Sequence, residues 1–115
     1  MANTFKLKTK ASLTTSLAPV YTVPNSPSTT AIVLGISLSN KDSSSRTADV
    51  LIVSNTDDTE VNANSYLGYG LPIPVGGTLE VMAGNKLVLQ ETDVIQAKAS
   101  AGSAVDIIIS IMEIV

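Results

Sequence analysis

The chain alternates between apolar and small or polar residues with a period of two, and not with the 3.6-residue period of a helix. Residues 31–38, AIVLGISL, give the clearest example. This alternation predicts a strand, because successive side chains of a strand point to opposite faces. The predicted faces hold Ile32, Leu34, Ile36 and Leu38 on one side and Ala31, Val33, Gly35 and Ser37 on the other.

Two further runs also predict strands. Residues 47–53, TADVLIV, are apolar on both faces apart from Asp49, which suits a strand sandwiched between two layers. Residues 93–100, DVIQAKAS, alternate strictly, so their polar side chains are expected outside and their small and apolar ones inside. The predicted inward set of this run is Ile95, Ala97 and Ala99.

The last run, residues 105–115, has a long apolar face opposite Asp106 and Ser110. Glu113 is anomalous there, since alternation aligns it with the apolar face. Either the register shifts near the end of this strand, or the face leaves the core and meets solvent or another subunit. The predicted apolar face is made by Val105, Ile107, Ile109 and Ile111.

Stretches rich in Gly, Pro, Asn, Asp and Ser separate these runs at intervals of about 8 to 15 residues, as turns between strands do. No segment has a convincing helical pattern. We therefore predict one all-β domain, a single antiparallel β-sandwich that is jelly-roll-like. Residues 1–12 are expected to form an N-terminal arm or an edge strand, and residues 13–115 the β-sandwich domain.

The glycine-rich region of residues 68–86 raises the question of a phosphate-binding loop. Gly68 and Gly70 match the start of a dinucleotide fingerprint, but Ile73 stands where its third glycine is needed. A Walker A loop fails too, because no hydroxyl residue follows Lys86. Turn formation explains the glycines better, with positive φ expected at Gly76-Gly77 and Gly84-Asn85.

Composition narrows the possible functions. Apolar residues make up 44% of the chain and charged residues only 15%, which leaves little charge to cover a small domain and favours self-association. The net charge is −3 and the cations are scattered, so we expect no nucleic-acid partner. The absence of Cys and His removes thiolate ligands, the usual zinc site and the commonest general base. No apolar run reaches membrane-spanning length and the start resembles no export signal, so no membrane partner is expected.

The carboxylates suggest two kinds of site, and the sequence favours neither. Asp57, Asp58 and Glu60 are oxygen donors of the kind that calcium uses, but their spacing does not match an EF-hand, so a solvated loop is expected. Candidates for paired glycoside chemistry are the carboxylates of Glu80, Glu91, Asp93, Asp106 and Glu113. Aromatic residues, however, are only 3% of the chain and leave few platforms for a sugar. We predict no enzyme activity, no cofactor and no bound metal.

Two groups of side chains are candidates for an interaction surface, in addition to Glu113. Lys6, Lys8 and Lys10 alternate with Phe5, Leu7 and Thr9, which fits an edge strand whose cations discourage aggregation, or an arm that docks onto an acidic neighbour. Tyr66 and Tyr69 are the only clustered aromatic residues and would stack on a glycan, although a pair of tyrosines more often serves packing.

From residue 20 onward the order of motifs resembles small virion structural proteins of tailed bacteriophages, especially those of marine and cyanobacterial phages. The resemblance is strongest from Leu71, where PIPVGGTLEV, GNKLVL, DVIQAKAS and a closing SIMEI follow in order. It implies a β-sandwich subunit that works in symmetric copies, and it carries over no catalytic residue.

Together these observations predict a non-enzymatic virion structural protein, located in the virion after assembly in the host cytoplasm. We expect a homo-oligomer, with a trimer as the first expectation, that binds the capsid as a decoration or cement protein or joins the neck or tail. Its partners would be copies of itself and other phage proteins such as the major capsid protein or neck and tail proteins. The alternative is a host-recognition or glycan-binding module of a tail fibre.

Overall fold

The computed structural model of the chain describes residues 3–55, 63–82 and 84–115. Nine strands lie in these residues, and none of the described residues is helical, so the all-β prediction is confirmed. The strands are β1 (Asn3–Lys10), β2 (Ala18–Thr22), β3 (Thr30–Asn40), β4 (Arg46–Val53), β5 (Ser65–Ile73), β6 (Thr78–Glu80), β7 (Leu87–Leu89), β8 (Val94–Ala99) and β9 (Val105–Ile114).

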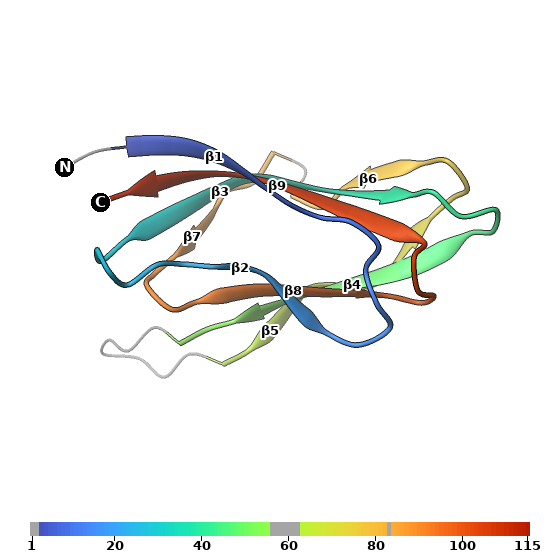
Figure 1. Cartoon of the computed structure of the whole chain (residues 1–115), viewed down its shortest axis with the longest axis horizontal. Helices are drawn as coiled ribbons and strands as arrows, with labels where there is room; N and C mark the ends of the chain where they lie inside the picture. The colour runs from blue at the N-terminus through green and yellow to red at the C-terminus, as the bar shows by residue number, and fades with distance from the viewer. Residues whose placement is uncertain (1–2, 56–62, 83) are drawn as a thin grey trace.

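The strands form two antiparallel sheets that face each other in a sandwich-like arrangement (Figure 1). Sheet A has the order β1-β9-β3-β6, and β7 pairs with the other half of β3. Sheet B has the order β2-β8-β4-β5. Strands from the two ends of the chain are therefore neighbours in each sheet: β1 lies beside β9, and β2 lies beside β8.

The core lies between the sheets and consists almost wholly of aliphatic side chains. The predicted alternation of β8 and β9 is confirmed, because their predicted inward residues are all buried. Burial of these side chains is the main favourable contribution to folding. The buried residues in question are Ile95, Ala97 and Ala99 of β8, and Val105, Ile107, Ile109 and Ile111 of β9.

β3 does not keep one face throughout its length, so the predicted faces are wrong in its first half. Ala31 and Val33 are buried, whereas Ile32 is half-buried and Leu34 is exposed. The pairing of β3 with β9 shifts between Val33 and Gly35, which marks a β-bulge. One extra residue at a bulge exchanges the two faces of a strand, so Ile36 and Leu38 share the buried side with Ala31 and Val33.

β4 is less covered than its sequence predicts. It lies between β8 and β5 in sheet B, where Ala48 and Val50 point to the core and are buried. On the other side of the strand Thr47 is exposed and Leu51 is half-buried. The prediction of a strand sandwiched between layers is wrong, because the described residues form two layers and this face of β4 has none above it.

The turn between β5 and β6 carries the chain from sheet B to sheet A. Gly76 has a φ of 68° and Gly84 a φ of 88°, as turn formation predicts, whereas Gly77 and Asn85 do not have the positive φ that was expected of them. The N–H of Gly77 donates to the carbonyl of Pro74 at 2.9 Å and closes the turn. The glycine-rich region therefore contains turns in the described residues.

Replacing Gly76 by alanine is expected to lower the free energy of unfolding by about 1–2 kcal/mol, because a Cβ disfavours positive φ. Urea unfolding followed by circular dichroism measures the change. Gly102→Ala is the matched control, since Gly102 has no positive φ and no atom would lie within 4 Å of its Cβ. Equal losses of unfolding free energy in the two variants would contradict the prediction that positive φ at Gly76 causes the effect.

Candidate interaction surfaces

The three lysines of β1 lie on the side of the strand that faces the other sheet. β1 is the edge strand of sheet A and pairs with β9 along its length. Each lysine stands beside a buried residue of β9, so the apolar residues between the lysines point outward. Lys8 and Lys10 are half-buried. The register pairs are Lys6–Ile111, Lys8–Ile109 and Lys10–Ile107.

Glu113 lies on the core-facing side of β9 and is buried. The strand therefore neither shifts its register at Glu113 nor turns this face out of the core. The pairing of β1 with β9 runs past it without a shift. Its Oε1 lies 2.7 Å from the Nζ of Lys6, and its Oε2 accepts the hydroxyl of Tyr21 at 2.6 Å. The Nζ of Lys8 lies 5.9 Å from the centre of the Tyr21 ring. A cluster of charged and polar side chains thus closes the core between β1 and β2.

The electrostatics of this cluster shift two pKa values in opposite directions. Burial alone would raise the pKa of Glu113, but the hydrogen bonds from Lys6 and Tyr21 and the charges of Lys6 and Lys8 hold it below its ordinary value. Burial raises the pKa of Tyr21 strongly, and its hydrogen bond to Glu113 and the nearby carboxylate raise it further. At neutral pH the cluster therefore holds an ionised carboxylate and a neutral phenol.

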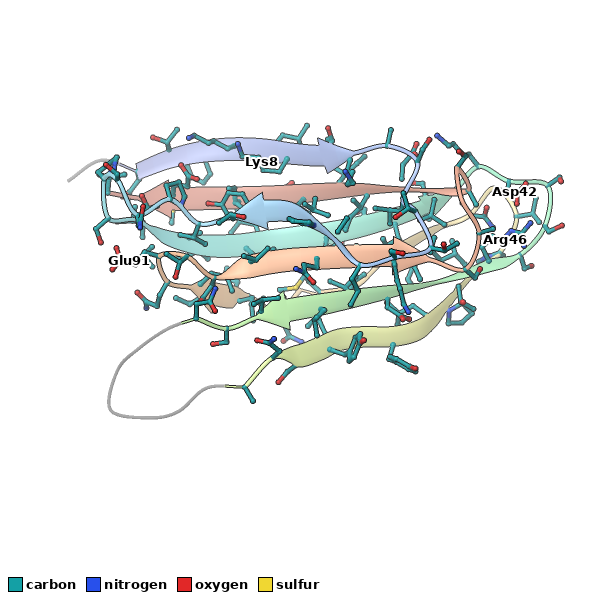
Figure 2. The ribbon with its side chains drawn as sticks, turned by 60° about the horizontal axis from the view of Figure 1, so that its bottom comes forward. Lys8, Asp42, Arg46 and Glu91 are labelled. Carbon is teal, nitrogen blue, oxygen red and sulfur yellow. The ribbon has the colours of Figure 1, made fainter. Side chains whose placement is uncertain are left out.

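A second carboxylate ties the connection after β1 to the start of β9. Asp106 accepts the backbone N–H of Ser12 at 2.7 Å and lies 2.9 Å from the Nζ of Lys41. The Ser12 hydrogen bond is the main cause of a lowered pKa at Asp106, and Lys41 adds to it. A third ion pair joins Asp42 to Arg46 at 2.6 Å, at the end of the molecule where β3 leads into β4 (Figure 2).

Acid is expected to destabilise the fold through Glu113 and Asp106. Both carboxyls have folded-state pKa values below their ordinary 4.5 and 3.8, so their contribution is present above those values and is lost as the pH falls through the lowered ones. The urea concentration at the midpoint of unfolding should decrease as the pH is lowered from about 5 to about 2.5. Glu113→Gln should make that fall shallower. A midpoint that stays constant over this range would contradict the prediction.

The outer side of sheet A is apolar across its width. Phe5 is 72% exposed and Leu7 is 63% exposed, and both stand on the side of β1 opposite its lysines. Leu34 and Ile108 are also exposed on this side. One row of register partners crosses four strands: Phe5 of β1, Met112 of β9, Ile32 of β3 and Val88 of β7. We call these seven residues the apolar face: Phe5, Leu7, Ile32, Leu34, Val88, Ile108 and Met112.

The charged groups nearest to the apolar face are engaged within the chain. Glu80 accepts the backbone N–H of Ile36 at 3.0 Å and the hydroxyl of Ser37 at 3.0 Å, which supplies a partner to the backbone beside the β3 bulge. Asp106 lies at the far end of β9 and binds Ser12 and Lys41 as described. The face is therefore largely hydrocarbon, with the exposed Ser110 beside Leu7 within it and carboxylates at its margin.

The sequence contains a signal for the apolar face of sheet A. In β1 the lysines alternate with Phe5, Leu7 and Thr9, and in β9 the face that holds Asp106 and Ser110 also holds Ile108, Met112 and Ile114. Such a pattern indicates that a strand has two hydrophobic sides, of which a two-layer fold can bury only one. The bulge in β3, which turns Leu34 outward, carries no comparable signal in the sequence.

Tyr66 and Tyr69 lie on β5, an edge strand of sheet B, and their rings meet edge to face with centroids 4.9 Å apart. The clustering that the sequence indicates is therefore present. Tyr69 is 73% exposed and borders a hollow of about 340 Å³. The hollow also contains Asp49 and Lys98, which the sequence analysis did not select as site residues. These two meet only because β4 and β8 pair in this register.

The carboxylates weighed for catalysis lie in different parts of the molecule. Glu91 accepts the hydroxyl of Ser28 at 2.7 Å beside the β7–β8 connection, at the end opposite Asp42 and Arg46 (Figure 2). Glu80 belongs to sheet A. Asp57 and Asp58 lie outside the described residues. Among the described residues, no group of three acidic side chains is placed to hold a metal ion, and no helix is long and apolar enough to cross a membrane.

Comparison of the chain with models of protein families, with curated proteins and with solved structures finds no match.

Proposed function

We propose that the protein is a non-enzymatic structural subunit of a bacteriophage virion that assembles as a symmetric homo-oligomer. The main evidence for assembly is the apolar face of sheet A. It includes a row of register partners over four strands, exposed at Phe5 and Val88 and half-buried between them, and apolar surfaces of this kind on small domains mark interfaces. The low share of charged residues agrees with burial of this face against other copies.

The oligomer forms by packing of the apolar faces and not by addition of a strand to β1. The lysines of β1 point inward at the sheet edge, which is a known way to prevent strand addition. Lys6 is held by Glu113, so an acidic neighbour would have to compete with that carboxylate for it. Phe5 and Leu7, in contrast, are free to enter a face-to-face interface.

The strand order supports a jelly roll as the topology. Each sheet places a strand from the start of the chain beside a strand from its end, β1 beside β9 and β2 beside β8. Double-sheet jelly rolls occur in capsid proteins and in lectins. The resemblance to small phage virion proteins favours the first of these, with a place on the capsid as a decoration or cement protein, or at the neck or tail. Many weakly bound copies would then gain avidity by bridging neighbouring subunits.

Native mass spectrometry of the purified protein tests the assembly, and binding to purified capsids and tails of the source virus tests the virion role. We expect one discrete oligomer, a trimer in the first instance, that attaches in stoichiometric amounts to one of these structures. A monomer at all concentrations would overturn the assembly through the apolar face. A stable oligomer that attaches to neither capsids nor tails would overturn the virion role alone.

A further inference from the structure

We propose that the hollow on the outer side of sheet B binds a saccharide through Tyr69, Asp49 and Lys98. This goes beyond the structural role, because the hollow lies on the sheet opposite the apolar face. Its volume of about 340 Å³ is within the range of small-ligand sites. Thr47 and Ser100 add hydroxyl-bearing side chains to its wall.

Asp49 gives the hollow a buried acceptor. Asp49 is 8% exposed, and its Oδ1 accepts the backbone N–H of Gly70 at 2.6 Å. The N–H of Gly70 is available to the carboxylate because Gly70 belongs to the irregular stretch where the pairing of β5 with β4 shifts, and the hydrogen bond holds Oδ1 in place. Oδ2 is the oxygen that faces Lys98, and it retains room to accept a hydroxyl. A fixed carboxylate of this kind suits recognition of a sugar hydroxyl.

Lys98 supplies a donor beside that acceptor. Its Nζ lies 3.6 Å from Oδ2 of Asp49, which is too long for a tight hydrogen bond, so each group keeps capacity for another partner. Two neighbouring hydroxyls of a sugar ring match this arrangement, since one donates to the carboxylate while the next accepts from the ammonium. The opposite charges also compensate each other, which favours a neutral ligand over an ionic one.

Tyr69 supplies the apolar contact that a sugar ring needs. Its ring is largely exposed at the border of the hollow, and Tyr66 packs against it with an angle of 78° between the ring planes. This edge-to-face contact restricts the Tyr69 ring before any ligand arrives, which lowers the entropy cost of binding. The aliphatic C–H face of a pyranose fits against such a ring, while its hydroxyls reach Asp49 and Lys98.

Titration of the ¹⁵N-labelled protein with glucose, galactose, mannose and N-acetylglucosamine, each to millimolar concentrations, tests the site by amide chemical shifts. We expect at least one sugar to shift the amides of Gly70, Lys98 and Ser100. Tyr69→Ala and Asp49→Asn should each weaken that binding at least tenfold. Asparagine retains an oxygen for the Gly70 N–H, so the local fold should persist.

Gln96→Ala is the matched control, because Gln96 lies on the same side of β8 as Lys98 but outside the hollow. It should leave the affinity unchanged. Absence of shifts with all four sugars would overturn the proposal, and so would a loss of binding in Gln96→Ala as large as in Tyr69→Ala. Because the apolar face is not involved, these results are independent of the oligomeric state.

Discussion

Replacing Ile108 by lysine is expected to dissociate the oligomer into folded monomers. Ile108 belongs to the apolar face on β9, where it stands between Thr9 and Ser37, and it is 41% exposed in the isolated chain. In an interface formed by this face, the new ammonium would lose water without gaining a partner, which typically costs several kcal/mol. Since about 1.4 kcal/mol is a tenfold change in affinity, the dissociation constant should rise by a factor of about 100 or more.

Gln96→Lys is the control for this experiment, because it adds the same charge to the outer side of sheet B. Analytical ultracentrifugation over a range of concentrations measures the association of both variants and of the unchanged protein. The control should assemble normally. If Ile108→Lys assembles as well as the control does, the apolar face is not the interface, whatever the size of the oligomer.

Replacing Glu113 by alanine is expected to lower the free energy of unfolding by about 3 kcal/mol at neutral pH. The change leaves the buried hydroxyl of Tyr21 without its acceptor, which costs about 1–3 kcal/mol. It also removes a buried side chain from between the sheets and opens a cavity. Lys6 adds little to the cost, because its side chain is 42% exposed and can reach water.

Urea unfolding at pH 7 measures this loss, with Glu91→Ala as the control. Glu91 is exposed and its partner Ser28 is exposed too, so its removal should change the stability by about 0.5 kcal/mol or less. The triple variant Lys6→Met, Tyr21→Phe, Glu113→Leu should recover much of the stability, because matched apolar groups can replace a satisfied buried polar cluster. Similar losses in Glu113→Ala and Glu91→Ala would show that the cluster contributes nothing of note.

The candidate surfaces were only partly predictable from the sequence. Tyr66 and Tyr69 are clustered in the sequence, but a spacing of three residues places side chains on opposite faces of a regular strand. Their contact therefore depends on the irregular stretch of β5, where its pairing with β4 shifts. The partners of Glu113 are different, because Tyr21 is 92 residues away in the chain and meets it only through the packing of sheet B on sheet A. Asp49 and Lys98 likewise meet across a strand pair whose register the sequence alone does not fix.

The sequence by itself determined the strand type of the runs that alternate, the inward faces of β8 and β9, and the turns at Gly76 and Gly84. These properties are local, since side-chain alternation and backbone preference act over a few residues. The tertiary structure decided the exchange of faces in β3, the burial of Glu113 and the exposure of the apolar face. Each of these depends on which strand pairs with which and in what register, and that choice is made by the packing of the whole chain.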